Sequence, residues 1–207
     1  MRLGILLSGR GSNFLAIAES IKSGRLKGVE IAAVISNVAD APGLKAAQEL
    51  GLQNAALVSK GRKREEHDRA MIECLKSQRV DLVCLAGYMR LLTPAFVAAF
   101  PNRILNIHPS LLPAFPGLDA QEQAIAYGVK VAGCTVHFVD NELDHGVIVL
   151  QRAVPVLEGD DGHTLADRIL KEEHLAYSEA IGMVASGEYE IKGRRFAKRE
   201  AGSSRPV

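Results

Sequence analysis

The sequence predicts an α/β protein in which a doubly wound, mostly parallel sheet is followed by an antiparallel hairpin and a long final helix. In the first half, short apolar runs alternate with segments of helical periodicity, a pattern typical of βαβ units. In the second half, two strand-like runs lie close together and precede a long amphipathic stretch. We therefore expect helices on both faces of one sheet.

The first half supplies strands and helices in alternation. The expected strands are apolar and rich in β-branched residues, and they span residues 3–7, 29–36, 55–58, 81–86 and 103–107. The expected helices carry their apolar residues on one face, and they span residues 14–21, 42–51, 64–77 and 94–100. In such sheets ligands bind beyond the carboxyl ends of the strands, which singles out residues 8–13, 87–90 and 108–116.

The second half predicts a hairpin and a helix. Residues 131–139 and 147–156 alternate in a strand-like way, and the short polar segment 140–146 lies between them. We expect these runs to pair around that segment. Residues 165–184 continue a single helical pattern and predict the long final helix.

Length and composition indicate one soluble domain. The chain has 207 residues, of which 47% are hydrophobic and 24% charged, and no run approaches the ~18 apolar residues of a membrane span. We expect a single domain over residues 1–187 and an exposed, poorly packed tail over residues 188–207. The formal net charge of +1 provides no global attraction for nucleic acid or an anionic membrane. The cysteines, His137 and His145 lack the spacing of a disulfide framework or metal site, and the default compartment is the cytoplasm.

The glycine-rich turn Ser8–Asn13 joins the first expected strand to the first helix. Its glycines let the backbone approach a ligand closely, and free N–H groups at a helix start attract phosphate. The turn lacks the complete G-x-G-x-x-G pattern because Phe14 fills the last position, and it lacks the lysine of a P-loop. A plain tight turn in which Ser12 or Asn13 caps the helix is the alternative.

Asn106 and His108 are neighbours on one face of an expected strand, because alternate residues of a strand point the same way. An amide beside an imidazole suits an oxyanion that develops on a carbonyl. Pro109 and Pro113 interrupt regular structure in the next segment and favour a rigid loop. A lone histidine is otherwise often a packing residue, and that interpretation stays open for His108.

Two carboxylates have both an ordinary explanation and a functional one. Asp144 lies in the segment Asp144–Gly146, whose residue types are common in turns. Glu173 shares a helical stripe with Ile169 and Tyr177, and a charge on a buried face must be paired or face a ligand. A structural salt bridge accounts for Glu173 equally well.

Residues 106–113, which read Asn-Ile-His-Pro-Ser-Leu-Leu-Pro, are followed by Asp144 and Gly146, and together they closely resemble the formyltransferase family that uses 10-formyltetrahydrofolate. Residues 8–13 and 87–90 make the resemblance more specific, and it covers roughly residues 1–187, which is nearly the whole chain. It implies a Rossmann-like formyltransferase fold. The implied reaction moves the formyl group of 10-formyltetrahydrofolate, a co-substrate, to the amine of glycinamide ribonucleotide, the third step of de novo purine biosynthesis. The amine attacks directly through a tetrahedral intermediate, without a metal.

The resemblance also implies roles for individual residues. The catalytic group matches Asn106, His108 and Asp144. The residues that bind the nucleotide substrate match Gly11, Ser12, Asn13, Arg64 and Glu173. The residues of the folate pocket match Met89, Arg90, Leu92, Val97, Asp140, Asn141, Glu142 and Leu143. The implied partners are small-molecule substrates, without nucleic acid or membrane, and the implied assembly is a monomer or a homodimer.

The chain departs from the family pattern at two positions. Ala114 stands where many relatives carry Lys, and Val147 follows Gly146 where Pro is frequent. Neither departure touches the implied chemistry. Ala114 leaves open how its loop is held and how charge is distributed around the site.

Other functions make different demands on the sequence. A tRNA-directed formyltransferase needs an additional nucleic-acid-binding domain and a formyltetrahydrofolate hydrolase normally carries a regulatory domain, and we expect neither here. A non-catalytic nucleotide-binding module has no use for Asn106, His108 and Asp144 together. A nicotinamide oxidoreductase needs a full dinucleotide fingerprint and an acidic residue where Asn37 ends the second expected strand.

Overall fold

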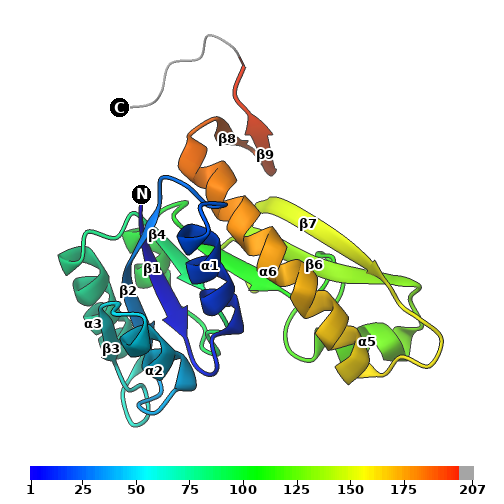
Figure 1. Cartoon of the computed structure of the whole chain (residues 1–207), viewed down its shortest axis with the longest axis horizontal. Coiled ribbons are helices and arrows are strands. Elements are labelled where there is room, and N and C mark those ends of the chain that lie inside the picture. Colours follow the sequence, from blue (N-terminus) through cyan, green and yellow to red (C-terminus); the bar gives the residue numbers. More distant parts are fainter. Residues whose placement is uncertain (201–207) are drawn as a thin grey trace.

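The computed structural model describes residues 1–200, and its main sheet confirms the mostly parallel arrangement predicted from the sequence (Figure 1). The strands lie in the order β3-β2-β1-β4-β5-β6-β7. They are β1 (Arg2–Leu7), β2 (Glu30–Ser36), β3 (Asn54–Ala56), β4 (Leu82–Leu85), β5 (Ile104–His108), β6 (Val131–Phe138) and β7 (Ile148–Pro155). Strands β1 to β5 pair in parallel, whereas β6 is antiparallel to both β5 and β7.

Helices cover both faces of this sheet. They are α1 (Ser12–Lys22), α2 (Pro42–Glu49), α3 (Arg64–Ser77), α4 (Pro94–Ala99), α5 (Ala120–Tyr127) and α6 (Gly162–Ser186). Ile5 of β1 belongs to the core shared with α1, α2, α5 and α6, and the adjacent Leu6 belongs to the core shared with α3 and α4. Because alternate strand residues point to opposite faces, both faces are buried and β1 is apolar almost throughout. Figure 1 shows α6 alongside α1 on one face.

Two helices differ from the sequence pattern. Helix α5 was not predicted, because only the small residues Ala120 and Ala124 are buried along it. Helix α6 begins at Gly162 rather than at residue 165, because Asp161 and Thr164 form a reciprocal capping box in which the Thr164 N–H donates to Asp161 Oδ1 at 2.7 Å. Over residues 1–200, no helix combines the length and apolar character needed to cross a membrane.

The carboxyl-terminal segment differs from the poorly packed tail expected over residues 188–207. Strands β8 (Tyr189–Lys192) and β9 (Arg195–Lys198) form an antiparallel hairpin. Phe196 stacks on Tyr189 with ring centroids 5.1 Å apart, and it packs edge-on against Phe138 of β6 at 5.5 Å. These aromatic contacts oppose the entropy lost when a charged segment is ordered. The rest of the expected tail, residues 201–207, lies outside the described residues.

The reversed direction of β6 determines where the following loop begins. His108 lies opposite Thr135 and Leu105 lies opposite Phe138, so β6 runs toward the amino-terminal end of β5. The loop over residues 139–147 starts at that end. It must fold back along the sheet before any of its side chains can reach the carboxyl end of β5.

Candidate active site

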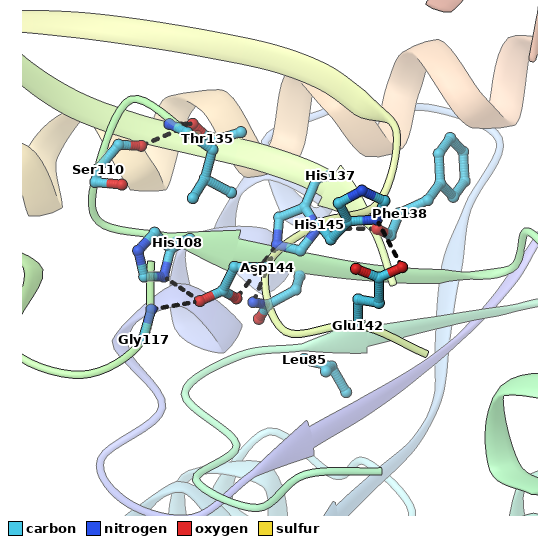
Figure 2. Close-up of polar contacts among 12 residues, drawn as sticks. Leu85, His108, Ser110, Gly117, Thr135, His137, Phe138, Glu142, Asp144 and His145 are labelled. Carbon is cyan, nitrogen blue, oxygen red and sulfur yellow. Dashed lines mark hydrogen bonds and ion pairs between the residues drawn. The ribbon is translucent and has the colours of Figure 1, made fainter. Parts of the chain in front are cut away.

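The carboxyl end of β5 carries the predicted amide and imidazole, and the loop after β6 brings a carboxylate to them. His108 Nδ1 lies 3.4 Å from Asp144 Oδ2, and both side chains are more than nine-tenths buried (Figure 2). Asn106 lies opposite His137 in the β5–β6 register, and its Nδ2 is 3.3 Å from His137 Nε2. The structure therefore brings together the residues that the sequence selected separately.

Asp144 is held in an unusual backbone conformation. Its φ is 49°, in the left-handed region, which costs roughly 1–2 kcal/mol for a residue other than glycine but is tolerated best by Asn and Asp. The Gly117 N–H donates to Asp144 Oδ2 at 2.8 Å, and His137 Nε2 lies 3.8 Å from Asp144 Oδ1. A Cβ at Gly146 would collide with the Phe138 carbonyl oxygen, so the loop closes tightly behind Asp144. The carboxylate is thus positioned from several sides, as the sticks in Figure 2 show.

His108 is oriented through both ring nitrogens. Its Nε2 lies 2.8 Å from the Phe115 carbonyl oxygen, while Nδ1 faces the Asp144 carboxylate. A carbonyl and a carboxylate both accept hydrogen bonds, so each ring nitrogen of His108 faces an acceptor. His108 therefore lies in a site suited to donating hydrogen bonds.

His137 favours the neutral imidazole. Burial lowers the pKa of His137, and its Nδ1 donates to the Phe138 carbonyl oxygen at 2.8 Å. Its Nε2 is then an acceptor for the Asn106 amide, whose orientation it fixes. The sequence alone suggests no role for His137 other than that of a possible metal ligand, for which the spacing is unsuitable. The signal that identifies it is the alternation of Thr135 and His137 along β6, opposite His108 and Asn106.

The glycine-rich turn forms a cavity of about 240 Å³ beside the loop that follows β4. The cavity is lined by Ser8, Gly9, Arg10, Gly11, Ser12, Asn13, Ala86, Gly87 and Met89. Ser8 Oγ accepts a hydrogen bond from the Met89 N–H at 2.8 Å, which joins the two loops. Both loops leave the carboxyl ends of neighbouring parallel strands, as the sheet pattern predicted.

Gly11 is the residue that opens α1. Its φ of 72° suits glycine, and a Cβ there would lie 3.1 Å from Leu7 Cδ2. In the part of the chain that the structure describes, no side chain caps this helix, so the alternative in which Ser12 or Asn13 caps it is not what the structure shows. The first N–H groups of α1 are therefore available to an anion.

Glu173 lies on the buried face of α6 that its helical stripe predicted. The Asn13 amide donates to Glu173 Oε2 at 2.8 Å, so its partner within residues 1–200 is a neutral amide rather than the cation of a salt bridge. Burial raises the pKa of the Glu173 carboxyl, while the Asn13 hydrogen bond and the nearby His108 oppose that shift. This carboxylate connects the glycine-rich turn to the β5 residues.

The residues expected to bind folate lie on the loop after β4, on α4 and on the loop after β6. Leu92 and Val97 are partly buried in the apolar cluster that also contacts Val139, directly before the loop of Asp144. Met89 is 73% exposed and lines the glycine-turn cavity. The stretch Asp140–Leu143 is largely exposed. Val139 therefore packs against the same apolar cluster as Leu92 and Val97, whereas the rest of its loop does not.

Arg64 is not brought into this group. It is exposed at the first position of α3 and does not line the glycine-turn cavity. Among residues 1–200, no group of three or more His, Cys, Asp and Glu side chains is placed to hold a metal ion.

Comparisons with known proteins identify what the chain resembles. The family model described as formyl transferase matches residues 1–181. Phosphoribosylglycinamide formyltransferase of Escherichia coli strain K12 is 42% identical over 192 residues, which make up 92% of this chain and 90% of that enzyme. The crystal structure of glycinamide ribonucleotide transformylase 1 from Symbiobacterium toebii has a TM-score of 0.93 and 52% identity, covering 97% of this chain and 94% of that one.

A much longer relative contains a region that is similar to this chain. The trifunctional purine biosynthetic protein adenosine-3 of Drosophila pseudoobscura pseudoobscura is 45% identical over 189 residues, which are 90% of this chain. The matched region spans only 14% of that protein's length.

Proposed function

This chain belongs to the formyl transferase family, and on that premise we propose that it transfers the formyl group of 10-formyltetrahydrofolate to the amine of glycinamide ribonucleotide, in purine biosynthesis. One observation carries the proposal. Asn106, His108 and Asp144 gather at the end of β5, in a chain that matches the bacterial enzyme of that activity over most of both lengths. Because the trifunctional relative is far longer, the proposal concerns the reaction of this chain alone.

The acceptor nucleotide lies along the cavity of the glycine-rich turn. Its phosphate accepts hydrogen bonds from the N–H groups of Gly11, Ser12 and Asn13, where the uncapped start of α1 favours negative charge. Glu173 accepts hydrogen bonds from the nitrogens at the glycinamide end, and Asn13 holds the carboxylate in place. A ligand at that point explains why a carboxylate is retained on a buried face.

The donor lies against the neighbouring loops. Leu92 and Val97 provide the apolar wall for the folate ring, and Met89 and Arg90 flank it. The loop over Asp140–Leu143 covers the other side, next to Asp144. This arrangement places the formyl group between the amine and the end of β5, and positioning of two bound substrates contributes a large part of the rate.

The reaction begins when the amine nitrogen attacks the formyl carbon. The electrons of the C=O bond move to oxygen, and the resulting oxyanion accepts hydrogen bonds from the Asn106 amide and the His108 imidazolium. Loss of one such donor typically raises the barrier by ~2.7–4 kcal/mol. In the structure, His108 Nε2 faces the Phe115 carbonyl oxygen. When substrate binds, the formyl oxygen replaces that carbonyl oxygen as the partner of Nε2.

Asp144 is the proton acceptor in this reaction. It accepts the proton that the attacking amine loses, directly or through one water, because its carboxylate already lies beside His108. The tetrahedral centre then collapses, the bond from carbon to N10 breaks, and N10 of the folate receives the proton. The products are the nucleotide that carries the formyl group on its former amine nitrogen, and tetrahydrofolate.

A formyl-transfer assay tests the proposal. The full chain is incubated with 10-formyltetrahydrofolate, with and without glycinamide ribonucleotide, and formylated nucleotide is measured by mass spectrometry beside the folate product. Formation of the formylated nucleotide is the expected result. Folate hydrolysis without transfer would indicate a deformylase, and the absence of both reactions would indicate a nucleotide-binding module, so either outcome overturns the proposal.

A further inference from the structure

The hairpin β8–β9 contacts the loop that carries Asp144. Arg194 lies in the turn of this hairpin, and its Nη2 donates to the His145 carbonyl oxygen at 2.6 Å. Its Nη1 donates to His145 Nε2 at 3.1 Å. One guanidinium therefore holds both the backbone and the side chain of the residue next to Asp144.

His145 also contacts Asp140, at the start of the loop. Its Nδ1 donates to Asp140 Oδ2 at 2.9 Å, and because a carboxylate only accepts, this nitrogen carries the proton. That tautomer leaves Nε2 free to accept from Arg194. Asp140 Oδ1 in turn accepts from the Glu142 N–H at 2.9 Å. The chain of hydrogen bonds runs from the hairpin across the whole loop.

The hairpin is itself anchored to the body of the protein. Phe196 packs against Phe138, the last residue of β6 before the loop. Arg199 donates to the Gly187 carbonyl oxygen at 3.1 Å and contacts Glu190 at 3.2 Å, which ties the hairpin to the end of α6. The hairpin thus holds the loop from both sides, at Phe138 and at His145.

Arg194 also shares a cavity with the reacting carboxylate. Asp144, His145 and Arg194 all line a space of about 380 Å³, together with Pro113 and Pro116 of the loop after β5. We propose that Arg194 is a positioning residue, which keeps the 140–146 loop folded back so that Asp144 faces His108. This inference rests on the proposed function, because it takes Asp144 as the proton acceptor.

Three variants of the full chain test the role of Arg194. Arg194→Ala is expected to lower kcat about tenfold to a hundredfold, since small misplacements of reacting groups have effects of that size. The KM for the nucleotide stays near the wild-type value, because the glycine-turn cavity lies apart from the hairpin contact. Arg194→Lys keeps one donor and recovers part of the loss. Arg195→Ala is the matched control, because the exposed Arg195 guanidinium forms no hydrogen bond or ion pair within residues 1–200.

A double variant separates positioning from general destabilisation. In an Asp144→Asn background, Arg194→Ala is expected to lower kcat no further, because the carboxylate that it positions is already absent. An equal loss in both backgrounds, wild-type kcat in Arg194→Ala, or an equal loss in Arg195→Ala would overturn the inference.

Hydrogen exchange tests the same contact without reference to catalysis. Amides of residues 140–146 are expected to exchange faster in Arg194→Ala than in wild type or Arg195→Ala. Unchanged exchange overturns the inference even if formyl transfer is observed. Faster exchange in a chain that transfers no formyl group would support the contact and overturn only the proposed function.

Discussion

His67 and Asp68 on α3 form one buried histidine–aspartate pair, and His108 and Asp144 form another at the end of β5. The separations are similar, with 3.6 Å between His67 Nδ1 and Asp68 Oδ1 and 3.4 Å between His108 Nδ1 and Asp144 Oδ2. The surroundings differ. Asp68 accepts the Thr93 N–H at 2.7 Å, and His67 Nε2 contacts the Leu57 carbonyl oxygen at 2.7 Å, so the first pair joins α3 to neighbouring loops.

The second pair is built from segments far apart in the chain and borders open space. Asp144 comes from a loop that folds back over the sheet, and it lines the cavity shared with Arg194. Neither His67 nor Asp68 lines either cavity described above, and both are at most 1% exposed. The comparison teaches that residue type and separation alone do not distinguish the two pairs. Contact with a cavity does, and its importance for the proposed function can be tested.

The largest expected difference is the effect of changing each carboxylate to its amide. Asp144→Asn is expected to lower kcat about 10²–10⁴-fold, the usual contribution of a general acid–base group. Nucleotide affinity, measured by calorimetry, is expected to stay near the wild-type value because the proposed phosphate site, at the glycine-rich turn, does not include Asp144. Asp68→Asn is the matched control and should leave turnover close to wild type. Near-wild-type turnover in Asp144→Asn would remove the proposed distinction between the pairs.

A smaller effect is expected from Glu173→Gln, which changes a carboxylate that borders the site. Hydrogen bonds to charged groups contribute ≈1.5–3 kcal/mol, so the KM for the nucleotide is expected to rise about tenfold to a hundredfold. Steady-state kinetics with varied nucleotide and saturating folate measure this change. A rise in the folate KM alone would place Glu173 at the other substrate.

Although Glu173→Gln is expected to bind the nucleotide more weakly, its folded state is expected to be more stable than that of wild type at neutral pH. Burial raises the pKa of Glu173 in the folded state. Such a carboxyl stabilises the fold fully below its unfolded pKa of roughly 4.3, and this contribution is lost as pH rises through the folded pKa. Glu173→Gln should therefore unfold at higher urea than wild type at neutral pH, with the difference shrinking in acid. A variant less stable than wild type at neutral pH would contradict this assignment.

The smallest effect on catalysis is expected from changing Asp68 in the histidine–aspartate pair on α3. Asp68→Ala leaves the buried Thr93 N–H without its acceptor, which costs ~1–3 kcal/mol in the free energy of unfolding. Urea denaturation measures that loss. At a temperature where the variant stays folded, kcat is expected to change little. A loss of kcat as large as that in Asp144→Asn would show that the pair on α3 also acts in the reaction.

The sequence predicted the parts of the site that follow a simple period. Asn106 and His108 alternate along one strand, and Glu173 lies on a helical stripe, so the direction of each side chain follows from local geometry. The glycine-rich turn was predicted from its place after β1. These features need no knowledge of the rest of the chain.

The remaining features depend on contacts between distant segments. Asp144 reaches His108 only because β6 reverses direction and its loop folds back, and a local pattern carries no information about that path. His137 acquires its role from its partner on β5. The charged residues from Lys192 onward predict an exposed, poorly packed tail, yet Phe196 of this segment packs against Phe138 of β6.

The hydrogen bond from Asn13 to Glu173 joins residues 160 positions apart. During synthesis, the glycine-rich turn leaves the ribosome well before Glu173 of α6 does. A nascent chain therefore holds this turn before the carboxylate that Asn13 will contact has been made. Until α6 docks against α1, the apolar face that includes Phe14 and Ile17 stays uncovered, and exposed apolar surface of this kind makes an unfinished chain prone to aggregate.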